Sequence, residues 1–183
     1  MGKGRLVILS GPSGVGKDTV IDAWKEVDPR VERVVARTTR QPRQGEVDGV
    51  DYVFLSVQDF ERLIAEGYFL EYKKVFDNYY GTPLHAVDEI LADGRIAILK
   101  IDVQGALSVM PLRPDALTVF LLPPSLEELK NRIEGRKSDT PEAISKRLAK
   151  ATEEIAQACR YQHQIVNDHF QLAVQKLQVL ASQ

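Results

Sequence analysis

The sequence predicts an α/β fold in which a parallel sheet is flanked by helices. Strand-like and helix-like segments alternate along the chain, as expected for β–α–β units with right-handed crossovers. Segment 96–101, apart from Lys100, and segment 117–122 are continuously apolar, which is typical of strands covered on both faces. A glycine-rich segment, 11–17, follows an apolar strand pattern and opens a helix pattern.

Each expected element has a local signal in the sequence. Strands are placed where short apolar or β-branched runs lie between turn residues, and helices where a capping residue or a proline precedes a helical pattern. The expected strands are 5–10, 32–38, 52–55, 69–76, 96–101, 117–122 and 164–167. The expected helices are 17–27, 56–67, one opened by Thr82-Pro83, one after Pro123-Pro124-Ser125, one from Thr140-Pro141-Glu142 toward Tyr161, and one from about Phe170. A polar loop is expected at 39–51 and a turn at Asp77-Asn78.

Length and composition narrow the class of protein. A chain of 183 residues fits one domain, and segment 34–85, which is rich in strand pattern, is expected to form an inserted lobe. The formal charge of −2 gives no field for gripping a nucleic acid or an anionic membrane. Cys159 is the only cysteine, which excludes intrachain disulfides and cysteine-cluster metal sites. The apolar run 6–9 is too short for a signal peptide, and no run reaches the ~18 apolar residues of a membrane span, so we expect a soluble cytoplasmic protein.

Segment 11–18 has the spacing of a phosphate-binding loop. Its glycines allow successive backbone N–H groups to converge on a phosphate, the helix N-terminus adds positive potential, and Lys17 would reach the β- and γ-phosphates. Asp18 stands where the pattern G-x-x-x-x-G-K-[ST] has a magnesium-binding hydroxyl, and Thr19 follows it. A glycine-rich turn with an exposed lysine is the alternative, which the preceding strand and following helix disfavour. The residues expected to contact ATP here are Gly11, Pro12, Ser13, Gly14, Val15, Gly16, Lys17, Asp18 and Thr19.

Segment 38–52, with the sequence TTRQPRQGEVDGVDY, offers a second anion site. Arg40 and Arg43 lie three residues apart around a stiffening proline and can form a fork for a phosphate monoester. Tyr52 and the pair Tyr79-Tyr80 add phenolic donors. Taken alone, the two arginines would fit a solvated loop face better than a phosphate site.

The chain resembles guanylate kinases over nearly its whole length. The motifs that carry the resemblance are GPSGVGK at 11–17, TTRQPRQGEVDGVDY at 38–52, NYYGT at 78–82, IDVQGA at 101–106, LPPS at 122–125, GR at 135–136, KRL at 146–148 and VND at 166–168. The resemblance implies transfer of the γ-phosphoryl group of ATP to GMP and dGMP, giving ADP and GDP, with Mg²⁺ as cofactor. It implies a core (1–33, 86–125 and 150–183), a GMP-binding lobe (34–85) and a lid (126–149), in a monomer or small homo-oligomer.

The resemblance also assigns roles to individual residues. Arg40, Arg43, Tyr52 and Tyr80 would hold the GMP phosphate. Glu71 and Thr82 would read guanine beside Asp102, since one carboxylate can accept from both N1–H and N2–H of guanine but is left unpaired by adenine. Lys17, Arg136 and Arg147 would act on the transferring phosphoryl group, and Asn167 would lie near the adenine. Arg132 is interpreted as structural.

Three positions depart from the family pattern, namely Asp18, Ala36 and Lys100. Ala36 replaces a serine near the guanine, which removes one base contact. Asp18 and Lys100 leave the metal ligands open: Mg²⁺ would be held mainly by phosphate oxygens and water, with Asp18 as the candidate protein ligand. A lysine in an apolar strand needs a partner, so we predict an Asp18–Lys100 ion pair beneath the phosphate loop. In the alternative, Lys100 reaches solvent and Asp18 caps its own helix.

Two other functions are compatible with the fold. A ribose 1,5-bisphosphate kinase-like enzyme can carry aspartate after the loop lysine but lacks the full arginine-proline-arginine and NYYG set present here. A non-catalytic guanylate kinase-like protein-binding domain tends to lose the loop lysine or the lid arginines, whereas Lys17, Arg136 and Arg147 are all retained.

Overall fold

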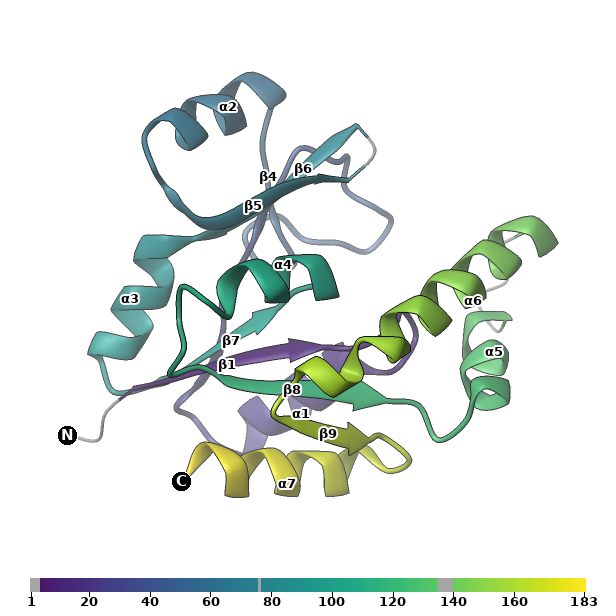
Figure 1. The fold of residues 1–183 in the computed structure, drawn as a ribbon. Helices are drawn as coiled ribbons and strands as arrows, with labels where there is room; N and C mark the ends of the chain where they lie inside the picture. Colours follow the sequence, from purple (N-terminus) through teal and green to yellow (C-terminus); the bar gives the residue numbers. More distant parts are fainter. Residues whose placement is uncertain (1–3, 76, 135–139) are drawn as a thin grey trace.

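The computed structural model describes residues 4–75, 77–134 and 140–183, and it has the predicted parallel sheet at its centre (Figure 1). Five strands lie in the order β2-β7-β1-β8-β9, and every neighbouring pair is parallel. These strands are β1 (Arg5–Ser10), β2 (Val31–Arg33), β7 (Ile96–Lys100), β8 (Leu117–Leu122) and β9 (His163–Val166). Because all of them are parallel, their carboxyl ends meet along one edge of the sheet.

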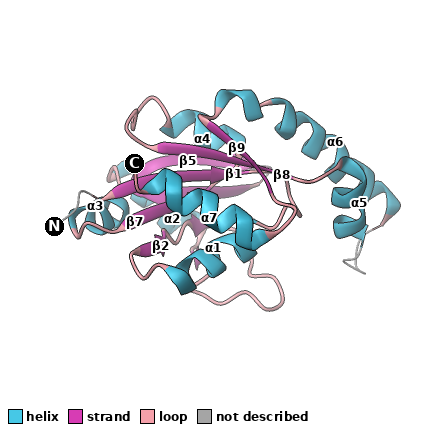
Figure 2. Cartoon of the chain, turned by 90° about the horizontal axis from the view of Figure 1, so that it is seen from below, coloured by secondary structure: helices cyan, strands magenta, loops and turns pink. Residues whose placement is uncertain are grey.

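Helices cover both faces of this sheet, as the continuous apolar strands predict. In β1, Val7 and Leu9 pack toward helices α1 (Lys17–Val27) and α7 (Phe170–Ala181). The alternate residues Leu6 and Ile8 pack toward helices α3 (Leu84–Ala92) and α4 (Val103–Val109). Figure 2 shows α1 and α7 together on one side of the sheet. Among the described helices, none is both long and apolar enough to cross a membrane.

A second, four-stranded sheet lies beside the first, in the order β4-β3-β6-β5 (Figure 1). Its strands are β3 (Arg37–Thr38), β4 (Val53–Phe54), β5 (Phe69–Val75) and β6 (Asn78–Pro83). Helix α2 (Val57–Ala65) is held against it by Phe60, whose ring stacks on Phe69 at 4.5 Å and on Tyr79 at 5.1 Å between centroids. The segment predicted to be rich in strands is therefore a sheet with its own small aromatic core.

Helix α5 (Leu126–Glu134) lies beyond the carboxyl ends of β1 and β8, and helix α6 (Pro141–Ala156) runs from there back toward β9 (Figure 1). They pack on each other through Leu129, Ile133 and Ala151. The predicted cap is confirmed, because the Thr140 hydroxyl accepts a hydrogen bond from the Ala143 amide at 3.2 Å. The helix ends at Ala156 rather than near Tyr161, and a 3₁₀ turn, η1 (Ala158–Arg160), follows it.

Two further sequence predictions were wrong in detail, and one helix was not predicted. The strand expected at 32–38 is two strands in different sheets, because the chain crosses between the sheets at residues 34–36. Residues 78–83 form strand β6, paired antiparallel with β5, so Thr82-Pro83 ends a strand and the next helix begins at Leu84. Helix α4 was not predicted, and it begins after Asp102, whose carboxylate accepts from the Gly105 amide at 2.9 Å.

Candidate functional site

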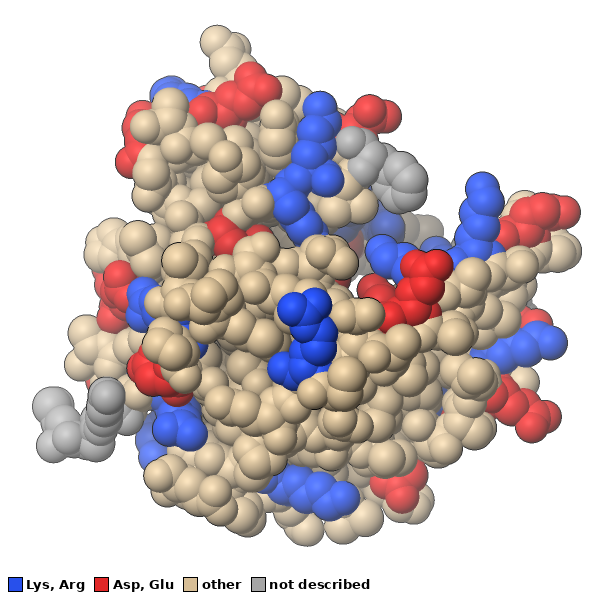
Figure 3. Space-filling view, viewed as in Figure 1, with Lys and Arg blue, Asp and Glu red and all other residues tan. Residues whose placement is uncertain are grey.

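An open cavity of about 860 Å³ lies at the carboxyl edge of the parallel sheet. Its walls come from the glycine-rich loop, the start of α1, the loop 39–52 and residues 167–170. Figure 3 shows the molecule hollowed between the second sheet and α6, with charged side chains of both signs nearby. Ligands of open parallel sheets bind at this edge, so the cavity is the candidate site.

The glycine-rich loop has the backbone shape that its sequence predicts. Gly14 and Gly16 adopt backbone φ angles of +86° and +97°, which residues other than glycine rarely adopt. A Cβ atom at Gly16 would also lie 2.8 Å from the Asn167 amide nitrogen. The Lys17 amine donates to the carbonyls of Gly11 and, at 3.2 Å, of Pro12, so it lies against its own loop.

Two side chains from distant elements fix this loop from outside. Asn167 Nδ2 donates to the Val15 carbonyl at 2.8 Å, which places the predicted adenine-site residue directly against the loop. Arg132, interpreted from the sequence as structural, lines the cavity and donates to the same carbonyl at 3.4 Å. Arg132 lies four residues before Arg136 in the sequence, and residues four apart share one face of a helix. This spacing is the sequence signal that could have assigned Arg132 to the site.

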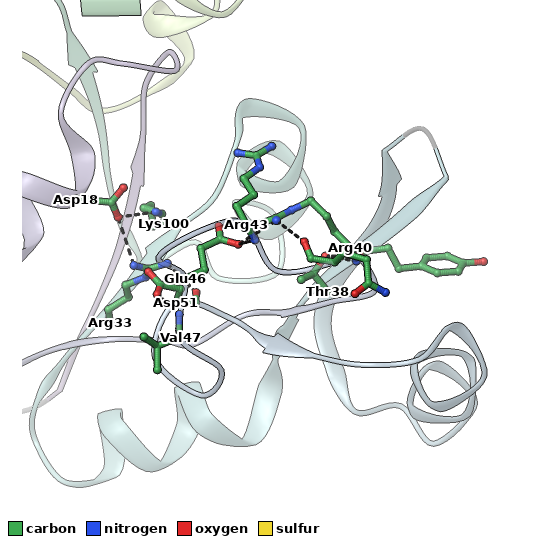
Figure 4. A network of polar contacts seen from close by, with 11 residues as sticks. Asp18, Arg33, Thr38, Arg40, Arg43, Glu46, Val47, Asp51 and Lys100 are labelled. Atoms are coloured by element: carbon green, nitrogen blue, oxygen red, sulfur yellow. Dashed lines mark hydrogen bonds and ion pairs between the residues drawn. The ribbon is translucent and has the colours of Figure 1, made fainter. Parts of the chain in front are cut away.

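The predicted ion pair between Asp18 and Lys100 is confirmed (Figure 4). Lys100 Nζ lies 2.5 Å from Asp18 Oδ1, and Arg33 Nη1 lies 3.3 Å from the same oxygen. Burial alone would raise the pKa of Asp18, but the hydrogen bond and charge of Lys100, helped by Arg33, hold that pKa below its ordinary value. The pair lines the cavity wall rather than lying beneath the loop, because the Asp18 side chain is 63% exposed.

Arg40, one of the two predicted phosphate-binding arginines, is held by a glutamate to which the sequence analysis gave no role. Its guanidinium donates to both carboxylate oxygens of Glu46, at 2.8 and 2.9 Å, and lies over the Tyr52 ring at 5.4 Å. The Arg43 amide also donates to Glu46, at 2.7 Å. The Arg43 side chain points away from this pair (Figure 4) and lines the cavity. Glu46 lies three residues after Arg43, in the same short polar loop as both arginines, and this proximity is the sequence signal that could have predicted their contact.

A smaller pocket of about 220 Å³ opens beside the main cavity and contains the predicted base-reading residues. The register of β5 and β6 places Glu71 opposite Thr82, and the Thr82 hydroxyl donates to Glu71 Oε1 at 2.8 Å. Burial raises the pKa of Glu71, although Thr82 and the charge of Lys73 oppose this rise. Tyr80 and Asp102 also line the pocket. Ala36 contributes only a methyl group, as the sequence indicates.

The structure puts neither of the two predicted catalytic arginines among the described residues that line the main cavity. Arg136 lies outside the described residues. Arg147 lies on α6, and the described lining of the main cavity does not include it. Within the described part of the chain, no three His, Cys, Asp or Glu side chains gather in a way that could hold a metal ion. Asp18 and Asp102 are carboxylates on the cavity wall near the loop, and both have cationic partners.

The parallel sheet, covered by helices on both faces and carrying the cavity at its carboxyl edge, defines an α/β protein with an open parallel sheet. Comparison with known proteins narrows this class. The guanylate kinase family model matches residues 3–183. The chain therefore belongs to the guanylate kinase family of enzymes, and the resemblance inferred from its motifs is confirmed.

Individual relatives agree with this assignment. A guanylate kinase of Rubrobacter xylanophilus is 46% identical over 97% of this chain and 93% of its own length. One of Gloeobacter violaceus is 52% identical over 96% of this chain and 86% of its own length. The crystal structure of guanylate kinase from Anaplasma phagocytophilum superimposes with a TM-score of 0.78 at 30% identity, covering 98% of this chain and 85% of that one.

Proposed function

We propose that this protein transfers the γ-phosphoryl group of ATP to GMP and dGMP, giving ADP and GDP. The proposal rests on three groups of residues that lie close together. The glycine-rich loop with Lys17 lines the main cavity, and so do Arg40 and Arg43. The pocket that contains Glu71 opens beside this cavity. Donor phosphates, acceptor phosphate and acceptor base thus each have a chemically matched partner. The division into a core, a GMP-binding lobe at 34–85 and a lid at 126–149 is part of this proposal.

On the donor side, the backbone N–H groups of residues 11–19, except Pro12, which has none, and the Lys17 amine would bind the ATP phosphates. Asn167 would act by holding the Val15 carbonyl and hence the loop. The donor set fits a metal that arrives with the nucleotide, because Mg²⁺ commonly takes one or two carboxylates together with phosphate oxygens and water. Asp18 would supply that carboxylate, and the ion would neutralise charge on the phosphates.

On the acceptor side, Arg40, Arg43, Tyr52 and Tyr80 would bind the GMP phosphate. Glu46 already fixes the Arg40 guanidinium, so this arm of the fork is oriented before the ligand arrives. Glu71, oriented by Thr82, would accept from N1–H and N2–H of guanine, and Asp102 lines the same pocket.

Transfer requires charge compensation at the moving phosphoryl group and exclusion of water from it. We assign the first task to Lys17, Arg136 and Arg147. The second would be met if segment 34–85 and the α5–α6 segment close toward Lys17 when both nucleotides bind.

A coupled assay of ADP formation with alternative acceptors tests the proposal. We expect turnover with GMP and dGMP and little with AMP or ribose 1,5-bisphosphate. Preference for ribose 1,5-bisphosphate would favour the related sugar-phosphate kinases. Absence of turnover with every acceptor would favour a protein-binding domain.

The affinity for ATP should depend on pH because of Lys17. Burial lowers the pKa of this amine to about 8, and the charge of Glu154 offsets only part of that effect. The protonated amine is the form that attracts phosphate, so affinity should be constant below pH 8 and fall by up to about tenfold per pH unit above it. Titration calorimetry with ATP between pH 7 and 9.5 measures this. Lys17→Arg, which keeps its charge, should give a flat profile, and a flat wild-type profile would contradict the assignment.

Arg43→Met should act on acceptor binding more than on rate. The GMP phosphate is charged in both the ground and transition states, so loss of this partner removes binding common to both. We expect the KM for GMP to rise by about 10- to 100-fold with a smaller change in kcat. Steady-state kinetics with saturating ATP would show it, and an unchanged KM would refute the role.

A further inference from the structure

The small base pocket contains a cation to which the proposed function gives no role. Lys73 lies two residues after Glu71 on β5, so both side chains project from the same face of the strand and both line the pocket. The Lys73 amine forms an ion pair with Asp102 Oδ1. It is nevertheless shielded from solvent and makes no well-directed hydrogen bond to any described residue. Asp102 faces one of the three N–H groups of this ammonium, and the other two find no acceptor among the described residues, so they are left for a ligand.

The environment of this amine is costly unless a ligand uses it. Burial lowers the pKa of Lys73, and the charges of Glu71 and Glu154 offset the effect while Lys150 adds to it. Asp102 compensates part of the cost of burying this charge, but N–H groups of the ammonium that lack an acceptor still lose free energy, which an acceptor on a ligand would restore. The pocket thus favours a ligand that carries an acceptor close to the groups recognised by Glu71.

Guanine has its acceptors in the required arrangement. Its O6 and N7 atoms lie on the edge next to N1–H, which Glu71 would bind. Two other donors around the pocket are already engaged. The Thr82 hydroxyl already donates to Glu71 at 2.8 Å, and Lys100 lies 2.5 Å from Asp18. Ala36 has no polar atom in its side chain.

We propose that Lys73 is a specificity-determining residue that donates to the O6/N7 edge of the acceptor base. This inference rests on the proposed use of GMP as acceptor. Adenine carries an amino group in place of O6, so an ammonium there would face a donor instead of an acceptor. Glu71 and Lys73 would then read adjacent edges of one base. Discrimination by Lys73 would come from position 6, because N7 is an acceptor in both guanine and adenine.

Base analogues combined with Lys73→Met test the proposal. Both 6-thio-GMP and 7-deaza-GMP keep N1–H and N2–H, but the first weakens the acceptor at position 6 and the second removes N7. We expect wild-type protein to bind GMP about tenfold or more tightly than at least one analogue in calorimetry. Lys73→Met should bind GMP more weakly by a similar factor and lose that preference, while Lys73→Arg, which keeps the donors, should retain it.

Lys150→Met is the matched control, because Lys150 lines the same pocket from α6 and is exposed. It should leave the preference for GMP over both analogues unchanged. A Lys73→Met protein that kept the full wild-type preference would overturn the inference but leave the proposed function intact. Wild-type protein that neither binds nor phosphorylates GMP would overturn the proposed function as well, so the two failures are distinguishable.

Discussion

Glu71→Gln is expected to abolish most of the preference for GMP over AMP. The carboxylate can accept from both guanine donors, whereas the amide of glutamine must turn its own N–H₂ group toward one of them. Sites that depend on such buried hydrogen bonds discriminate by roughly 10⁴-fold. We therefore expect kcat/KM for GMP to fall by about 10³-fold or more. The ratio of kcat/KM for GMP to kcat/KM for AMP should fall with it. Steady-state kinetics with the two acceptors measures both quantities.

A glutamate-to-glutamine substitution outside the base pocket, on the helix that packs against the second sheet, provides a control. Glu61 on α2 is exposed and accepts from the Tyr79 hydroxyl at 3.3 Å, away from the pocket lining. Glu61→Gln should keep the wild-type ratio. Retention of that ratio in Glu71→Gln would remove Glu71 from base recognition.

In the wild-type protein, the preference for GMP over AMP should depend on pH in a way that matches the effect of Glu71→Gln. Because burial raises the pKa of Glu71, its protonated form becomes populated at a higher pH than that of an exposed glutamate. A protonated carboxyl, like the amide, cannot accept from both donors. Discrimination against AMP should therefore decline as the pH falls through the raised pKa, and Glu71→Gln should not show this decline.

The sequence was most informative where local signals and sheet topology agree. The bounds of β1, α1 and β8 were predicted because apolar runs and turn residues mark both of their ends. The Asp18–Lys100 pair was predictable from topology: β7 pairs in parallel with β1, and Leu9 pairs with Lys100 in their register. A lysine at that strand end was thereby brought close to the helix that follows the loop.

Features that neither a local signal nor the order of the parallel strands indicates were missed. Strand β6 is polar in sequence and exists because it pairs with β5 and β3, which its own residues do not signal. The contact of Lys73 with Asp102 joins a strand of one sheet to the end of a strand in the other, and no spacing rule relates the two positions. The hold of Asn167 on the Val15 carbonyl likewise spans 152 residues.

Lys17→Met is expected to lower kcat by about 10³-fold while changing the KM for GMP little. The Lys17 amine now donates to two carbonyls of its own loop, and bound phosphates would compete for the same donors. During transfer, negative charge shifts toward the bridging oxygen between the β- and γ-phosphates, so a cation there stabilises the transition state more than the ground state.

Methionine retains the length and most of the apolar stem of lysine and removes only the charged donor, so the loop backbone should keep its shape. Lys25→Met is the matched control, because Lys25 is exposed in the last turn of the same helix. It should leave kcat unchanged, and both variants should unfold at temperatures close to that of the wild type. The contrast with Arg43→Met is the decisive comparison: one cation would act on rate and the other on acceptor binding, although both line the same cavity. A folded Lys17→Met protein with kcat within about threefold of the wild type would show that charge compensation comes from elsewhere in the site.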